Sequence, residues 1–292
     1  MDSIPSLRGA PDIYQFDRYT QYLNAWVEFL RSSGAATPKA ELAKIARISL
    51  PYFSLILSGK RKLNSQVRDA LSENLRLDER EVRFFQALVR LNTEKDIDAR
   101  VQALDEMRSQ WRFRSQKPAE SEAFGYLSKS YIPTIREMAA FDDFRLDADW
   151  IRSRLVEDVP KSEIEKAVKF LLKHQLIERV PGGRIRPSKK VIRCDPELYR
   201  VSLAAYHKKM LGRASEAIFQ TPRRERNITG LTVAINEEAF DEVRDIIDTA
   251  VAQIVEVARR QETRNAVYHV NLVLFPTATS KPSKADDGSQ EV

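Results

Sequence analysis

Basic side chains are concentrated in one short stretch of this sequence. Residues 37–64, TPKAELAKIARISLPYFSLILSGKRKLN, hold six cations and one acid, a net charge of +5. Three of the cations, Lys60, Arg61 and Lys62, follow Gly59 without interruption. Ammonium and guanidinium groups bind phosphate oxygens, and such a cluster is typical of a contact with a nucleic-acid backbone. The chemistry indicated by these residues is therefore binding, with no bond made or broken.

The elements that must position these cations are two short helices joined by a tight turn. The first is expected to start with Thr37 as its N-cap and Pro38 in its first turn. Its inner face is marked by apolar residues three and four apart: Leu42, Ile45 and Ala46. The second is expected to follow Ser49 as N-cap and to end at Gly59, which can adopt a left-handed backbone. Three of its residues would point inward: Phe53, Ile56 and Leu57. The pattern predicts a helix-turn-helix.

Ten residues of this motif are expected to contact DNA: Lys39, Ser49, Leu50, Tyr52, Ser54, Leu55, Ser58, Lys60, Arg61 and Lys62. The outward side of the second helix carries no Arg, Lys, Asn or Gln, the residues that make bidentate contacts with base edges. Two alternatives to sequence-specific DNA binding therefore stay open. The hairpin is a purely structural element, or the apolar outward residues Leu50, Tyr52 and Leu55 dock on a partner protein.

The overall composition fits a globular protein without a catalytic centre. The chain has 292 residues, 42% of them hydrophobic, and a net charge of +6. Its one cysteine, Cys194, excludes an internal disulfide and a cysteine-based zinc site. We find no phosphate-cradling glycine loop and no nucleophile with a neighbouring base, so we expect no enzyme and no cofactor. With neither a signal-peptide pattern nor a membrane-length apolar run, a cytoplasmic protein is expected.

The spacing of apolar residues indicates three modules. Residues 13–114 are expected to form the helix-turn-helix domain with its connecting helices, and residues 112–118 a polar linker. Residues 119–194 are expected to form a winged-helix-like module, and residues 195–275 an α+β module. Residues 276–292 are polar and are expected to be a disordered tail. The predicted fold class is mostly α, with a minor α+β part.

Within the middle module, helices are expected to precede a small β-hairpin. Pro133 is expected to kink one helix, and Ser162 is expected to cap another in a capping box with Glu165. Gly182 and Gly183 are expected to form the tight turn of the hairpin, the wing of a winged helix. The wing has a basic edge whose four cations are candidate DNA contacts: Arg184, Arg186, Lys189 and Lys190.

The last module changes from helical to alternating patterns. A long helix is expected over residues 198–219 and another over 237–260, the latter capped by Asn236. Strands are expected over residues 228–235 and 266–275. Because two strands alone make a marginal sheet, other strands must complete it, either the wing or the same unit of a second subunit. The second option predicts that this region carries a homodimer contact.

Several segments resemble those of one family, predicted bacterial transcriptional regulators that join an XRE-like (lambda-repressor-like) helix-turn-helix to a C-terminal domain of unknown function. They are YFSLILSGKRKL (52–63), FFQALVRLN (84–92), YIPTIREMAAFDDFRLDADWIRSRL (131–155), AVKFLLKHQLIER (167–179), AYHKKML (205–211) and ITGLTVAINEEAF (228–240). The resemblance implies a homodimeric regulator that binds double-stranded DNA through its N-terminal domain. A signal-sensing or protein-interaction role with a degenerate helix-turn-helix stays as the alternative, and an effector, protein or small molecule, is left open.

Overall fold

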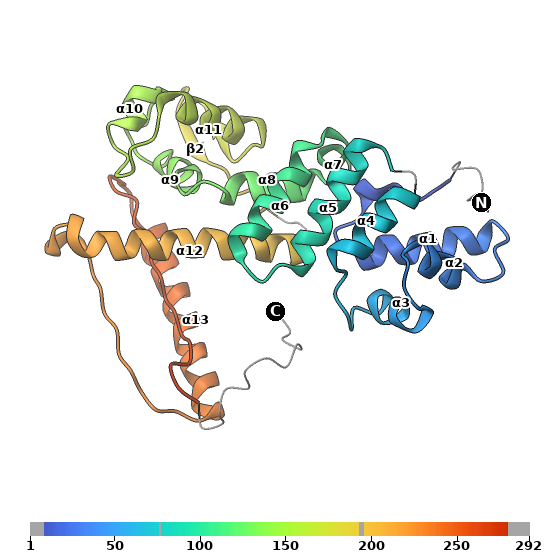
Figure 1. Ribbon diagram of the computed structural model, residues 1–292. Coiled ribbons are helices and arrows are strands. Elements are labelled where there is room, and N and C mark those ends of the chain that lie inside the picture. The colour runs from blue at the N-terminus through green and yellow to red at the C-terminus, as the bar shows by residue number, and fades with distance from the viewer. Residues whose placement is uncertain (1–8, 76, 193–195, 280–292) are drawn as a thin grey trace.

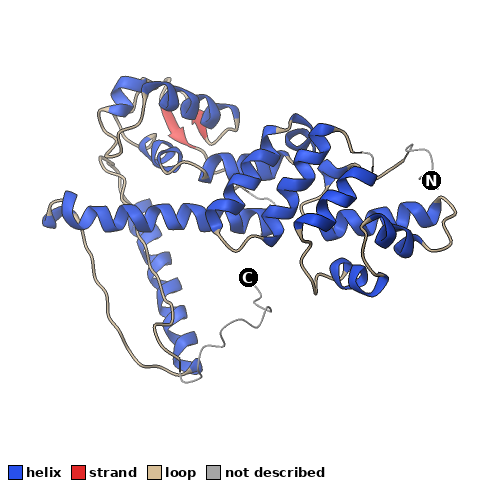
Figure 2. Cartoon of the chain, in the orientation of Figure 1, coloured by secondary structure: helices blue, strands red, loops and turns tan. Residues whose placement is uncertain are grey.

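The computed structural model describes residues 9–75, 77–192 and 196–279 of the chain. Within these residues the protein is mostly helical, with one antiparallel pair of short strands (Figure 2). The expected fold class, mostly α with a minor β part, is confirmed. Figure 1 shows the N-terminal helices at one end of an elongated molecule, a second helical module, and a C-terminal helix that projects away from both.

The N-terminal half is a helical bundle with its own hydrophobic core. Tyr22 and Trp26 from the first helix meet Phe84 and Phe85 from the fifth, and all four are almost completely buried. Aromatic burial on this scale is the main force that holds such a bundle together. The elements are η1 (Ile13–Gln15), α1 (Tyr19–Ser32), α2 (Pro38–Ile45), α3 (Leu50–Leu57), α4 (Ser65–Asn74), α5 (Glu79–Thr93), α6 (Ile97–Ser109), α7 (Trp111–Gln116) and α8 (Pro118–Leu127).

Residues 112–118 do not form the linker that we expected. They make up most of α7 and the start of α8, and the Phe113 side chain is fully buried against Phe84. Lys117 holds Asp17 at 3.0 Å. The polar composition of this segment was misleading because the single Phe113 anchors it to the first core, while Arg112 and Lys117 pair with Asp12 and Asp17 near the N-terminus.

The middle module has a second, separate core. Its elements are α9 (Tyr131–Met138), α10 (Ala148–Arg152), α11 (Lys161–Lys173), β1 (Ile177–Arg179) and β2 (Ile185–Pro187). The strands pair antiparallel, with Ile177 opposite Pro187. Gly182 and Gly183 turn the chain between them at φ +88° and +79°, where a side chain would strain the backbone. The helices followed by a hairpin reproduce the expected winged-helix order.

Two local expectations are wrong. Pro133 kinks no helix, because α8 ends at Leu127 and Pro133 lies in the first turn of α9, where its missing N–H is not needed. Ser162 does not cap α11, because the carbonyl of Pro160 already accepts from Ile164 and starts the helix before it. Thr37 is the N-cap residue of α2, as expected, although its side chain makes no capping hydrogen bond.

The long helix α12 (Pro196–Gln220) runs between the two cores (Figure 1). Leu198 and Val201 belong to the first core. Further along, Lys209 and Arg213 reach Glu157 of the middle module at 3.6 and 3.4 Å. The helix expected over residues 198–219 is confirmed, and it connects the modules physically. Cys194 lies outside the described residues.

The C-terminal part holds η2 (Arg223–Glu225) and α13 (Glu237–Arg259), which starts at the expected N-cap. The Asn236 side chain accepts from the Ala239 N–H at 2.9 Å. Residues 228–235 and 266–275 are extended, but neither is paired as a strand, so the two strands that we expected there are not formed. Among the described residues the wing strands pair only with each other, and neither of these segments takes part in a ladder. The tail beyond residue 279 lies outside the described residues.

Candidate nucleic-acid interface

The turn between α2 and α3 fixes the angle of the two helices by a left-handed residue. Arg47 adopts φ +57°, and the next N–H, that of Ile48, donates back to the Ala43 carbonyl at 3.0 Å. The Ser49 hydroxyl then accepts from the Tyr52 N–H at 3.4 Å and caps α3. Two short helices joined by a tight turn therefore lie between residues 38 and 57, in the order that the sequence predicted.

The inner face of α3 is held on the bundle. Phe53, Ile56 and Leu57 are buried, as the sequence predicted. Asn24 of α1 donates its side-chain amide to the Leu57 carbonyl at 3.2 Å, which satisfies one of the last carbonyls of α3. The helix is thereby fixed from its core face and from its C-terminal end, and its other face is open to solvent.

The open face of α3 is apolar and poor in hydrogen-bond donors. Leu50 is 42% exposed and Leu55 39% exposed, whereas Tyr52 and Ser54 are half-buried. The exposed Ser58 donates its hydroxyl to the Leu55 carbonyl of its own helix at 3.1 Å. Direct reading of base edges from this face would depend on Tyr52 and Ser54.

The cations around α3 differ in whether their side chains already have a hydrogen-bond partner. Lys39, Lys60 and Arg61 are exposed, and their side chains have no partner among the described residues. Lys62 instead donates to the Thr93 carbonyl at the end of α5, at 2.8 Å. Gly59, at φ +74°, ends α3 so that Lys60 and Arg61 follow its C-terminus directly. These two are the best-placed groups for a phosphate.

The basic edge of the wing is largely neutralised by carboxylates. Arg184 pairs with Asp142 at 2.8 Å, and Arg186 pairs across the hairpin with Glu178 at 2.8 Å. Lys190 reaches Glu122 at 2.7 Å. Of the four candidate wing contacts, Lys189 alone has no such partner in the part of the chain that the structure describes. A phosphate at the wing would have to compete with three existing ion pairs.

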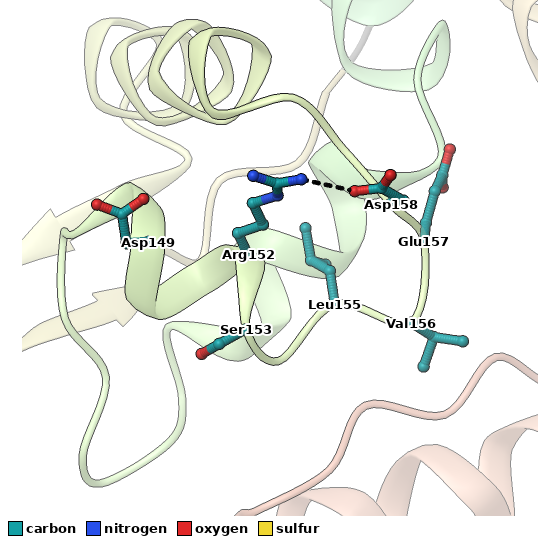
Figure 3. A pocket seen from close by; sticks show the side chains of 7 residues that line it. All are labelled: Asp149, Arg152, Ser153, Leu155, Val156, Glu157 and Asp158. Atoms are coloured by element: carbon teal, nitrogen blue, oxygen red, sulfur yellow. Dashed lines mark hydrogen bonds and ion pairs between the residues drawn. The ribbon is translucent and has the colours of Figure 1, made fainter.

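A hollow of about 390 Å³ lies beside α10 and is lined by Asp149, Arg152, Ser153, Leu155, Val156, Glu157 and Asp158 (Figure 3). Its acids already have partners. Arg152 pairs with Asp158 at 3.1 Å, and Lys161 holds Asp149 at 2.5 Å. Glu157 accepts from the buried Ser130 hydroxyl at 2.6 Å and faces α12. These carboxylates join α9, α10 and α12, and the described residues contain no group of acids, histidines or cysteines arranged for a metal.

Sequence reasoning missed three parts of the site. The left-handed Arg47, the Asn24 amide and the bond from Lys62 to Thr93 each depend on tertiary neighbours. Of these three, Asn24 could have been singled out from the sequence, because it is a polar residue between the apolar Leu23 and Trp26 of α1. Nothing in the sequence separates Lys62 from Lys60 and Arg61.

Comparison with known families places the C-terminal part of the chain. The model of a domain of unknown function, DUF4423, matches residues 110–277. The chain belongs to the DUF4423 family. The matched residues begin just before α7 and extend past α13, so they include the middle module and α12 but not α2 and α3. No curated protein and no solved structure matches the chain.

In the part of this DUF4423 protein that the structure describes, no helix combines the length and the apolarity that crossing a bilayer requires.

Proposed function

We infer that this DUF4423 protein is a DNA-binding transcriptional regulator that acts from its N-terminal helix-turn-helix. The observation that carries the proposal is the position of Lys60 and Arg61. Both are exposed, have no partner among the described residues and lie at the end of a helix whose inner face is buried. Unpaired cations beside an ordered, protruding helix are what contact with a phosphate backbone requires. The proposal includes the cytoplasmic location expected from the sequence.

The α3 face indicates that phosphates would contribute more affinity than bases. Without Arg, Lys, Asn or Gln on that face, few base-edge contacts can form. One short helix also buries too little surface for a specific site, and regulators of this architecture bind two half-sites as dimers. We therefore propose a homodimer on double-stranded DNA, with Lys39, Lys60 and Arg61 on the backbone and Tyr52 and Ser54 nearest the bases.

The experiment that tests this proposal is the salt dependence of DNA affinity. Phosphate contacts release counterions, so the logarithm of the affinity falls with the logarithm of salt by about 0.9 per contact. The double variant Lys60→Ala, Arg61→Ala should bind all sequences more weakly, and its slope should be smaller by about 2 per subunit for two lost contacts. Affinities are measured by fluorescence anisotropy at several salt concentrations.

A matched control is the double variant Arg80→Ala, Arg83→Ala, which removes the same charge from exposed positions at the start of α5. Lys62 contacts the other end of α5, so this pair lies roughly 20 Å along the helix from the α3 end of the bundle. The control should keep the wild-type slope. An unchanged slope in the Lys60, Arg61 variant, or an equal decrease in the control, would contradict the assignment.

A second candidate function follows from the exposed apolar side chains Leu50 and Leu55. With Pro51 between them, they give α3 a surface suited to a partner protein. On this alternative the chain is a sensor or interaction protein, and its DNA binding is weak and uniform. Changing Leu55 to Lys separates the two, because a cation at this position should strengthen binding to DNA and disrupt an apolar protein contact.

A further inference from the structure

The C-terminal arm, residues 227–275, exposes far more apolar surface than a lone chain would keep in water. Fifteen of its large apolar side chains are at least 40% exposed, among them Leu231, Phe240, Ile246 and Tyr268. Half-exposed side chains of this size and number present on the order of 1,000 Å² of apolar surface. That exceeds the roughly 800 Å² that each partner contributes to a standard protein interface. It also exceeds the largest patch on a typical monomer, about 300–600 Å².

The arm is attached at its base and open along its length. Val267 packs on the second core, and the His269 ring lies edge-on to Tyr206 of α12 with centroids 5.9 Å apart. Beyond this base, α13 has no buried residue, and it projects away from the body in Figure 1. Residues 227–238 are all exposed, although 231–235 alternate apolar side chains as a strand does. An extended, apolar segment without a strand partner is a template for pairing with another chain.

The distribution of charge along α13 favours a second copy of this chain as the partner of the arm. Its first half, residues 237–248, holds six acids and one arginine, a net charge of −5, whereas its end carries Arg259 and Arg260. An antiparallel pair of identical helices centred near Ala250 brings these arginines level with Asp241 and Glu242 of the other copy. A parallel pair would place acid against acid, which opposes association. The apolar stripe of Phe240, Ile247 and Ile254 repeats every seven residues, as a helix–helix seam does.

We propose that the C-terminal arm is a homodimer interface in which α13 of one copy packs antiparallel on α13 of a second copy. The extended segments of both arms then flank the helix pair, where each can receive a strand neighbour that it lacks among the described residues of its own chain. This inference deepens the proposed function, since it specifies how two helix-turn-helix domains are joined. It requires no DNA, so its test is independent of DNA binding.

The test is sedimentation equilibrium of the full-length chain with reversed charges on α13. The wild type should be a dimer at tens of micromolar. The variant Arg259→Glu, Arg260→Glu should dimerise at least tenfold more weakly, and so should Asp241→Arg, Glu242→Arg. The quadruple variant should recover the wild-type dimer, because the reversed charges again face opposite charges. Arg80→Glu, Arg83→Glu, a reversal on α5, should leave the dimer unchanged.

Circular dichroism of each variant shows whether α13 stays helical, which is expected because all four positions are exposed. A monomeric wild type at tens of micromolar overturns the proposal and assigns the arm to a different protein. A dimer that both reversals leave intact, or a quadruple variant that stays dissociated, overturns it as well. DNA binding, measured separately by anisotropy, can persist or fail in either case, so the two proposals fail independently.

Discussion

At the scale of single residues, the left-handed backbone of Arg47 costs free energy that the interactions of its side chain do not offset. A non-glycine residue in left-handed conformation costs roughly 1–2 kcal/mol, and the Arg47 ion pair with Glu73, at 3.3 Å, is exposed on both sides. We expect Arg47→Gly to be more stable than Arg47→Ala by about 1 kcal/mol. At Lys44, within α2, the order should reverse, because Gly costs about 1 kcal/mol relative to Ala inside a helix. Urea unfolding gives the free energy of unfolding of the Gly and Ala variants at both positions. Equal stability of the two Arg47 variants would contradict backbone strain at Arg47.

His174 makes the second residue-scale prediction, which concerns pH. Burial against Phe170, with ring centroids 4.4 Å apart, lowers the pKa of His174, and Glu122 at 3.4 Å opposes this only in part because Lys190 already holds that carboxylate. A lowered folded pKa means that the unfolded chain takes up the proton first. The stability that the neutral His174 ring contributes is therefore complete above the pKa of histidine in the unfolded chain, about 6.5. It is lost as the pH falls below that value.

The measurement is the difference in unfolding free energy between the wild type and His174→Gln from pH 7.5 to pH 5. Glutamine does not titrate, so other groups cancel in the difference. We expect the wild type to lose stability relative to the variant as pH falls. A relative gain for the wild type would show that His174 is folded as a cation paired with Glu122.

At the scale of elements, Gly125 sets the distance between α8 and α11. A Cβ built there would lie 2.7 Å from the Phe170 ring, closer than real contacts allow, so Gly125→Ala must displace the ring. Gly212, on the exposed side of α12, has no atom within 4 Å of such a Cβ. We expect Gly212→Ala to stabilise the protein by about 0.5–1 kcal/mol through helix propensity, and Gly125→Ala to destabilise it despite the same gain. The measurement is the thermal unfolding of both variants. Stabilisation by both substitutions would show that the α8–α11 contact accommodates a methyl group at position 125.

Elements with a local cause were predictable from the sequence, and those with a tertiary cause were not. Asp78, Asn236 and Asp147 are followed by helices that their side chains cap, because a cap is a contact within four residues. The helical state of residues 112–118 depends on where Phe113 packs, which no local pattern encodes. Residues 228–235 have the alternation of a strand, but a strand exists only with a neighbour, and they pair with none among the described residues.

The same distinction applies to the candidate site. Its inward residues, its N-cap Ser49 and its terminal Gly59 followed from spacing and residue type. Which cations are available did not follow, because the Thr93 carbonyl occupies Lys62, and Asp142, Glu178 and Glu122 occupy three of the four wing cations. Sequence reasoning counted charges correctly, and the structure was needed to find their partners.

At the scale of the whole molecule, α12 couples the N-terminal helical bundle to the C-terminal arm. It packs on the first core through Leu198 and Val201 and meets the arm through Tyr206. Two copies joined at their arms would therefore hold two helix-turn-helix domains at a fixed separation. Half-sites on DNA repeat at multiples of the helical turn, about 34–36 Å, so a joined pair gains specificity that a single α3 does not have.

The central claim, that this protein binds particular DNA sites through α3, is tested most directly by retention of pooled genomic fragments at moderate salt, followed by sequencing of what is retained. We expect the wild-type chain to retain a discrete set of fragments. The Lys60→Ala, Arg61→Ala variant should lose that set, whereas the Arg80→Ala, Arg83→Ala control should keep it. Weak retention of all fragments alike, by the wild type and by both variants, would contradict the account and favour the protein-interaction role of the apolar α3 face.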